Sequence, residues 1–542
     1  MAGVSPEHPA GPSTSDIRLV IAASSMGTVF EWYDFFIYGT LAGIIGKTFF
    51  PSGNATLETL LVWVGFAVGF GFRPLGAVLF GYLGDRLGRK YTFLVTVTLM
   101  GVATAGVGLT PSAETIGYAA PAAVLLLRVL QGLALGGEYG GAAIYVSEHS
   151  PADRRGFHTG FIQASVVGGF VLSLIVVLGC KAAMSEGVWN AWGWRVPFIL
   201  SIALLAVSLW MRFKLSESPV FRAMRAEGEI AGNPFIESFT YPGNRKRIFI
   251  ALFGIAAGLT VIWYTAMFSA MSFLKGAMRM EDTAAELIVG GAAALGMVFF
   301  VIFGSLSDRI GRRKPIVWGY ALTLALLFPA FWTIGNHANP GLSRAAAQAP
   351  VLVEGPDCDY NPFRAEQASP CGKLLGDLAS TGIAYRLATA PELRLRVGES
   401  VLPLSAYPWP DRKARSAVLE EWLGGKGYEF AKVRPSLRDG LVIGFTLLVL
   451  MALSGATYGP VAALLSEMFP PRIRYSSMSI PYHIGTGYFG GFLPLISSYM
   501  VASSGNPYQG LWYTWGVVAM ALVVSLWGLR GGPPRDYGED VS

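Results

Sequence analysis

Five ionisable residues stand inside long apolar stretches of this sequence. They are Glu31, Asp34, Arg73, Arg128 and Glu138. A charge at the centre of a lipid bilayer costs about 2.5–3.5 kcal/mol on insertion scales, so such residues usually face a cavity or a partner. Glu31 and Asp34 are three residues apart and therefore share one face of a helix. Two neighbouring carboxylates in a desolvated site can hold and release a proton, which predicts that Glu31 or Asp34 is a proton carrier.

The two arginines admit two roles. Arg73 and Arg128 either pair with these carboxylates, or one of them holds a substrate carboxylate through bidentate hydrogen bonds. The alternative for all four charges is a set of static pairs that only fixes helix packing. We assign proton coupling to Glu31, Asp34, Arg128 and Glu138, and substrate binding to Arg73. Five further side chains complete the substrate-binding prediction, each with packing or lipid contact as its alternative: Tyr33, Gln163, Tyr264, Tyr458 and Tyr482.

Glycines surround the last of the five ionisable residues. Glu138 lies among Gly136, Gly137, Gly140 and Gly141. Small residues let two helices approach closely in a membrane, so close packing is the favoured role of these glycines. Whether Glu138 itself takes part in coupling or only in packing stays open at this point.

The elements that must position these residues follow from the composition. Of the 542 residues, 53% are apolar and only 14% are charged, whereas soluble proteins carry roughly 25% charged residues. The apolar residues fall in blocks of about 20, the length that crosses a hydrocarbon core. All these blocks should be helices, because other open backbone leaves unsatisfied polar groups in lipid. Twelve spans are predicted: 19–45, 58–82, 91–110, 119–147, 159–181, 194–213, 247–273, 285–305, 315–335, 438–466, 478–502 and 511–530.

Basic residues set the orientation of these spans. Short clusters of Lys and Arg follow the second, fourth, eighth and tenth spans, and more lie between the sixth and seventh. The positive-inside rule therefore places both termini in the cytoplasm. This distribution fits membrane topology better than a nucleic-acid surface, despite the net charge of +6. The segment before Asp16 is expected to be a disordered tail and not a cleaved signal peptide.

The chain also repeats itself. Gly81-Tyr-Leu-Gly-Asp-Arg-Leu-Gly-Arg-Lys returns at Gly304, and Ser-Glu before a proline and an arginine occurs at Ser147 and again at Ser466. The second pair is 96 residues further apart than the first, which locates an insertion in the second half. We predict an all-α membrane protein of two six-helix bundles, 19–213 and 247–335 with 438–530. A linker (214–246), an external insertion (336–437) and cytoplasmic tails (1–18 and 531–542) complete the domains.

Several motifs resemble those of a known family. The Gly-x-x-x-Asp-Arg-x-Gly-Arg-Lys segment ending at Lys90 resembles the signature loop of the major facilitator superfamily. Segments 31–36, 73–76, 128–141 and 194–198 are similar to the metabolite:proton symporters, the group of permeases for α-ketoglutarate, shikimate and proline or betaine. The resemblance implies two parallel six-helix halves and alternating access. It further implies proton-coupled uptake of a small organic carboxylate or zwitterion, without choosing among them.

The same resemblance implies a gate at the cytoplasmic ends of the helices. Charged residues of both halves would hold this gate closed like a latch. The alternative is that these residues only fix the orientation of the helices in the membrane. An anion such as Asp85 can meet the positive N-terminal end of another helix, and arginines can pair with glutamates. The residues assigned to the gate are Asp85, Arg86, Arg89, Glu148, Asp308, Arg309 and Glu467.

The remaining features limit the function. Cys358 and Cys371 lie thirteen positions apart in the external insertion, where an oxidising compartment would favour a disulfide over free thiols. We find no metal framework and no HExxH, GxSxG or P-loop motif, so we expect no cofactor and no enzyme activity. The prediction is a monomeric proton symporter of a bacterial inner (plasma) membrane. The alternatives are a proton-coupled efflux antiporter and, from another class, a sensor built on a transporter-like body.

Overall fold

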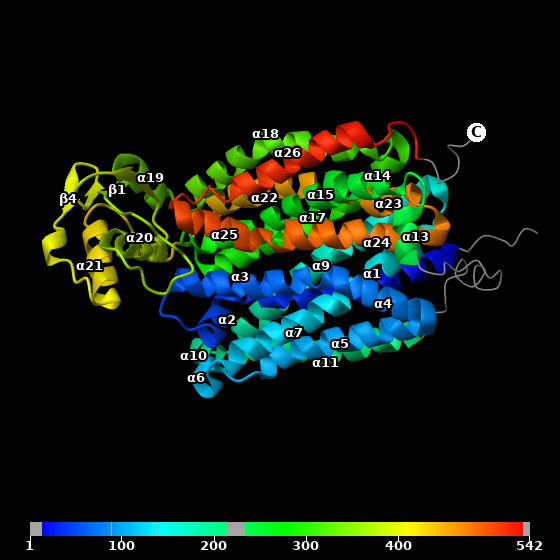
Figure 1. The fold of residues 1–542 in the computed structure, drawn as a ribbon, viewed down its shortest axis with the longest axis horizontal. Helices are drawn as coiled ribbons and strands as arrows, with labels where there is room; N and C mark the ends of the chain where they lie inside the picture. Colours follow the sequence, from blue (N-terminus) through cyan, green and yellow to red (C-terminus); the bar gives the residue numbers. More distant parts are fainter. Residues whose placement is uncertain (1–13, 88, 138, 214–233, 535–542) are drawn as a thin grey trace, which may run out of the picture.

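The computed structural model describes residues 14–87, 89–137, 139–213 and 234–534. Two helical halves lie side by side along the long axis, and a small domain caps one end (Figure 1). We call this end the insertion end and the opposite one the far end. Glu138, the linker residues 214–233 and most of both predicted tails lie outside the described residues. The side chains of the predicted gate residues Asp85, Arg86 and Arg89 lie outside them too.

The first half follows the predicted spans, with breaks inside several of them. Its second span, for example, is broken at Phe72, directly before the Arg73-Pro74 pair, because the helix-forming bond pattern stops where proline lacks an N–H. The elements are α1 (Thr14–Thr40), α2 (Ala42–Phe49), α3 (Ala55–Gly71), α4 (Arg73–Leu87), α5 (Arg89–Leu109), α6 (Ala113–Ile116), α7 (Ala119–Gly136), α8 (Tyr139–Glu148), α9 (Arg155–Ala183), α10 (Glu186–Ala191) and α11 (Val196–Phe213).

The second half contains wider, π-helical turns in two of its spans, η3 (Ile250–Ala256) with η4 (Thr265–Ser269), and η7 (Gly485–Gly491). Such turns often occur at functional sites of helices. The other elements of this half are α13 (Pro234–Thr240), α14 (Asn244–Phe249), α15 (Ala257–Tyr264), α16 (Ala270–Lys275), α17 (Asp282–Ile310), α18 (Arg313–Ala338), α22 (Leu437–Tyr458), α23 (Val461–Met468), α24 (Arg474–Ile484), α25 (Leu493–Ser504) and α26 (Leu511–Gly528).

Nine stretches among the described residues are helical, long and apolar enough to cross a membrane. They match nine of the twelve predicted spans. The other three are less apolar or shorter: α1 carries Glu31 and Asp34, the apolar part of α5 is only Leu94–Leu109, and 478–502 is rich in Gly, Ser and Tyr. The total of twelve spans therefore stays a prediction.

Glycines bring α7 against α3 and α4. A side chain at Gly132 would overlap the carbonyl oxygen of Gly69, and one at Gly136 would overlap the carbonyl oxygen of Arg73. The neighbouring atoms are backbone and cannot move aside. Close helix approach is therefore built into this part of the first half, as the glycine pattern predicts. Arg128 lies in the same contact, since its side chain packs against Gly69.

The insertion between α18 and α22 is an α/β domain with its own core. Its sheet has the order β2-β1-β3-β4, with β1 parallel to β2 and the other two pairings antiparallel. The prediction of an all-α chain is wrong here. Val351–Gly355 forms a strand in which buried and half-buried residues alternate, as expected when one face of a sheet packs on a core. The elements are α19 (Pro340–Gln348), β1 (Val351–Gly355), α20 (Pro370–Thr381), β2 (Tyr385–Thr389), β3 (Arg394–Val397), β4 (Ser400–Leu402) and α21 (Arg412–Gly424).

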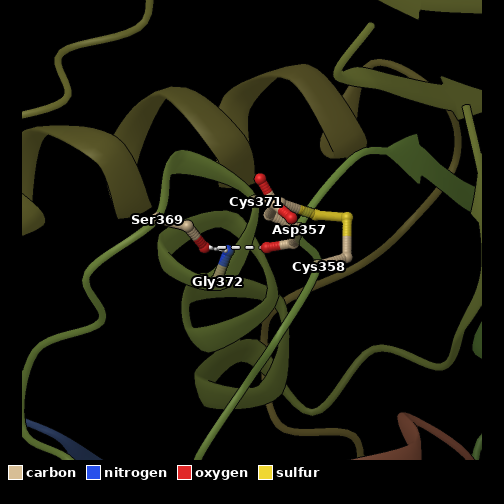
Figure 2. The surroundings of a disulfide bond; sticks show 5 residues. All are labelled: Asp357, Cys358, Ser369, Cys371 and Gly372. Atoms are coloured by element: carbon tan, nitrogen blue, oxygen red, sulfur yellow. Dashed lines mark hydrogen bonds between the residues drawn. A yellow bond between two sulfur atoms is a disulfide. The ribbon is translucent and has the colours of Figure 1, made fainter. Parts of the chain in front are cut away.

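A disulfide joins Cys358 to Cys371 at the start of α20 (Figure 2). Ser369 supports the same turn: its hydroxyl donates to the carbonyl of Asp357 at 3.1 Å and accepts from the N–H of Gly372 at 3.0 Å. The cross-link thus ties the loop after β1 to the first turn of α20. The cross-link closes a small loop in the unfolded chain. It should stabilise the insertion chiefly by reducing the conformational entropy of that unfolded chain.

Removing this cross-link should loosen the insertion. The double substitution of Cys358→Ser and Cys371→Ser should lower the free energy of unfolding of the insertion by about 3 kcal/mol, the value expected for a loop of this length. Native-state proteolysis of the full chain measures this change, because cleavage follows the population of the opened domain. Cys180→Ser, at the free cysteine of α9, is the control. Equal cleavage rates for the double variant and this control would contradict the prediction.

Candidate functional site

A cluster of buried charged side chains holds the two halves together at the far end. Glu467 of α23 accepts hydrogen bonds from Arg312 Nε at 3.1 Å and Nη2 at 2.7 Å. Arg155, at the start of α9 in the other half, lies 3.5 Å from the same carboxylate. The side chains of Glu467 and Arg312 are almost fully buried. A buried pair of this kind is costly to break by removing one partner.

The repeat of the sequence reappears in this cluster as approximate symmetry. Glu148 of α8 lies 3.7 Å from Arg474 of α24, which is the reciprocal of the pair between Glu467 and Arg155. Each arginine follows the glutamate of its own half by seven positions. The hydroxyls of Ser147 and Ser466, which occupy equivalent positions of the repeat, form a hydrogen bond of 2.6 Å. Residues at equivalent positions can meet in this way only at the symmetry axis, so the axis passes between these serines.

Asp308 forms a second connection between the halves. Its carboxylate accepts the backbone N–H groups of Gly156 at 2.8 Å and Phe157 at 2.9 Å, in the first turn of α9. Arg312 donates to the same carboxylate at 2.6 Å. An acidic side chain at a helix N-terminus is stabilised by the free N–H groups and the helix dipole. Asp308 thus makes the kind of contact that was expected of Asp85, its counterpart in the first repeat.

Of the residues assigned to the gate, Arg309 is exposed. Arg312, which the assignment did not include, donates to Asp308. Sequence reasoning also missed Arg155 and Arg474. The repeat contained the signal in each case, because Arg312 corresponds to Arg89 of the first motif and the two other arginines correspond to one another. Asp308, Glu148 and Glu467, which were assigned to the gate, lie in this cluster.

A further ion pair joins the halves at the insertion end. Glu286 of α17 is buried and accepts hydrogen bonds from Lys181 of α9 at 2.9 Å and from Lys275 of α16 at 2.6 Å. Two cations therefore share one carboxylate. The sequence offered no signal for this group, because its members are separated in the chain and stand at helix ends.

The four central charges are buried between the two ends. Glu31 and Asp34 are 7% and 5% exposed, and Arg73 and Arg128 are fully buried. Arg128 Nη1 donates to the side chain of Gln131 at 2.6 Å, and its guanidinium lies over the rings of Phe35 and Tyr38. Arg73 Nη1 donates to Thr486 of the other half at 3.5 Å.

Several buried polar atoms in this region lack a hydrogen-bond partner among the residues that the structure describes. They are Asp34 Oδ1, Arg128 Nε and Nη2, the hydroxyl of Tyr264 and Trp263 Nε1. Such atoms normally have a partner, since an unpaired buried group costs about 1–3 kcal/mol. These groups of both halves are thus available to a polar guest or to water.

The predicted substrate-binding side chains do not all come together. Tyr264 lies between the halves, packed against Phe36, Phe66 and Phe268. Tyr458 and Tyr482 share a hydrogen bond between their hydroxyls and are buried in the second half. The hydroxyl of Tyr33 instead donates to the carbonyl of Pro197 at 2.6 Å, which is a packing contact inside the first half. Gln163 is fully buried in α9.

The aromatic side chains around Tyr264 form a layer between the central charges and the insertion end. Phe36 stacks on Trp263 with ring centroids 5.1 Å apart, and Trp63 packs edge-on against Phe268. Trp63 and Phe268 also line a cavity of about 460 Å³ at the insertion end, bounded by α3, α16 and α25. The far end is therefore closed by ion pairs, while a cavity lies at the other end above the aromatic layer.

Comparison with known proteins identifies the family. The profile described as "Sugar (and other) transporter" matches residues 19–235. The alpha-ketoglutarate permease of Escherichia coli is 34% identical over 346 residues, which cover 63% of this chain and 78% of the permease. The shikimate transporter of the same organism is 36% identical over 59% of this chain and 74% of that protein. The chain belongs to the metabolite:proton symporter family of the major facilitator superfamily.

One more relative and one solved structure complete the comparison of this metabolite:proton symporter family member. The proline/betaine transporter of Salmonella typhimurium is 34% identical over 59% of this chain, and the match spans 65% of that transporter's length. The proton:xylose symporter XylE, solved with 6-bromo-6-deoxy-D-glucose, matches 97% of this chain and 98% of its own, with a TM-score of 0.61 and 15% identity. At that identity the likeness shows the fold, which is the major facilitator fold. These relatives are transporters and not enzymes.

Proposed function

We propose that this protein is a secondary active transporter that couples uptake of a small organic carboxylate or zwitterion to protons. It would act as a monomer with twelve spans and both termini in the cytoplasm, in a bacterial inner membrane. The observation that carries the proposal is the arrangement along the long axis. Crossed ion pairs close the far end, a cavity lies at the insertion end, and buried carboxylates and arginines stand between them.

In this scheme the carboxylates of α1 bind and release the proton. Asp34 is buried and one of its oxygens has no partner among the described residues, so this side chain can gain or lose a proton without breaking a fixed ion pair. Glu31 lies three residues away on the same helix face. Protonation removes a charge from the membrane interior, which lowers the cost of a rearrangement that moves α1 out of contact with water.

In this scheme the solute binds to groups of both halves, between the far end and the insertion end. The free N–H groups of Arg128 can bind a carboxylate, and Tyr264 and Trp263 offer further donors from the second half. Arg73 already connects the halves through Thr486. A solute that bridges these groups would draw the halves together at the insertion end. The aromatic layer would have to part for it to enter.

Release then requires the far end to open. The pairs of Glu467 with Arg155 and of Glu148 with Arg474, and the contact of Asp308 with α9, would separate as the halves rock about their common axis. The pair of Lys181 with Glu286 would persist and keep the halves joined at the insertion end. Proton and solute leave together toward the cytoplasm in this scheme.

Uptake into liposomes that contain the purified protein tests this function. With the outside more acidic than the inside, 2-oxoglutarate, shikimate or glycine betaine should accumulate above its external concentration, and a protonophore should abolish the accumulation. Reversing the pH gradient separates the antiporter alternative, because an antiporter accumulates solute only when the inside is the more acidic. Accumulation that ignores the gradient in both directions would contradict proton coupling altogether.

A further inference from the structure

The insertion completes the wall of the cavity at the insertion end. Residues Ala379 to Ile383, at the turn between α20 and β2, line this cavity together with α3 of the first half and α16 and α25 of the second. The insertion is held there by contacts with the second half. Arg279, between α16 and α17, donates to the carbonyls of Thr381 and Phe430, and the N–H of Tyr385 donates to the carbonyl of Gly505 at 3.1 Å. The cavity is thus a composite of three parts of the chain.

Positive charge dominates the wall of this cavity. Lys275, Arg279 and Lys432 line it, and no carboxylate does among the residues that the structure describes. Lys432 is paired with Asp282, but Lys275 shares Glu286 with Lys181, so that group keeps a net positive charge. Burial lowers the pKa of Arg279, yet a guanidinium stays charged at neutral pH. The lining therefore favours an anion.

The wall also offers hydrogen-bond donors that are not in use. Trp63 Nε1 and the hydroxyl of Ser269 are buried and have no partner in the described part of the chain. An indole N–H can only donate, so its missing partner must be an acceptor. Hydroxyl-bearing residues from three parts of the chain line the same cavity: Thr56, Thr59, Ser272, Ser380, Ser497 and Ser498.

We propose that this cavity is a binding site for small organic anions, hydroxylated or oxo-carboxylates in particular, at which the insertion supplies one wall. Its volume of about 460 Å³ is in the range of small-molecule sites. A carboxylate there would face Lys275 and accept from Trp63, while hydroxyl or oxo groups would meet the serines and threonines. A quaternary ammonium would meet cations instead. The inference rests on the proposed function for its role, since the site would capture solute before it reaches the aromatic layer.

Equilibrium binding to the full chain in lipid nanodiscs tests the site without any gradient. Calorimetry with 2-oxoglutarate and shikimate as anions, glycine betaine as zwitterion and xylose as neutral solute should show binding of an anion. Lys275→Gln should raise its Kd about tenfold, the loss expected for one charge-assisted hydrogen bond. Glu286 keeps Lys181 in this variant, so no buried carboxylate is left alone. Ser380→Trp should block the site from the side of the insertion.

Two matched controls accompany these variants. Lys413→Gln removes the same charge, and Ser405→Trp adds the same ring, both at exposed positions of the insertion outside the cavity lining. Neither should change the Kd. Anion binding that is equal in all four variants, or absent at millimolar anion, overturns the site. If anion binding depends on Lys275 and Ser380 but the protein shows no proton-driven uptake, the proposed function is contradicted and the proposed site is supported.

Discussion

Replacing Asp34 by asparagine should abolish proton-driven accumulation while solute exchange across the membrane survives. The amide keeps the size and polarity of this buried side chain but cannot take up a proton. A tenfold proton gradient can sustain up to about tenfold accumulation for one proton per solute, and the variant should show none. Uptake into liposomes under an imposed pH gradient, beside counterflow of labelled solute without a gradient, measures both properties.

The design separates coupling from damage to the fold. Counterflow reports that the Asp34→Asn protein still folds, binds solute and rocks, whereas accumulation reports the proton. Glu114→Gln, at an exposed carboxylate of α6, is the matched control and should accumulate normally. Glu31→Gln tests the second carboxylate of α1 in the same assay. If neither Asp34→Asn nor Glu31→Gln changes the accumulation, the assignment of the proton to α1 is wrong.

The second large effect is expected at the far end. Asp308→Ala removes two hydrogen bonds to the first turn of α9, both of which cross between the halves. Hydrogen bonds to a charged group contribute about 1.5–3 kcal/mol each, and water satisfies these N–H groups once the end opens. The closed arrangement should therefore lose at least about 3 kcal/mol, roughly a hundredfold or more in the ratio of closed to open molecules. Distances between spin labels on the far ends of the two halves would show the shift.

The neighbouring residue provides a control. Arg309→Ala also changes the net charge by one unit, in the opposite direction, one position away and at a residue that is exposed. It should leave the label distances unchanged. Asp308→Asn, which keeps the shape of the side chain, should give an intermediate shift. Equal distance distributions for Asp308→Ala and Arg309→Ala would contradict the role of Asp308 in holding the halves together.

Much of the fold could be predicted because bilayer thickness fixes the length of apolar helices. The repeat went further, since the equivalence of Ser147 and Ser466 in the sequence became a direct contact between them. The pairing of Arg312 with Asp308 has a geometric cause that the repeat did not contain. The helix α17 ends at Ile310, and Gly311 has a positive φ. The chain turns there, and Arg312, which follows the turn, reaches back to Asp308.

Other parts of the site depend on tertiary contacts that no local pattern contains. The strands of the insertion have only three to five residues each, and such short segments are defined by their neighbours in the sheet. Lys181 and Glu286 stand 105 positions apart, in different halves. Tyr33 was expected to bind substrate beside Asp34, but its place on α1 turns its hydroxyl toward Pro197.

The attachment of the insertion has a mechanical consequence. Its chain connections to α18 and α22 and its bonds from Arg279 and to Gly505 all belong to the second half, whereas the opposite lip of the cavity, α3, belongs to the first. The insertion should therefore move with the second half when the two halves rock, and its contact with α3 should change. Two labels, one on the insertion and one on α3, would report this movement, and a cross-link between them would block it.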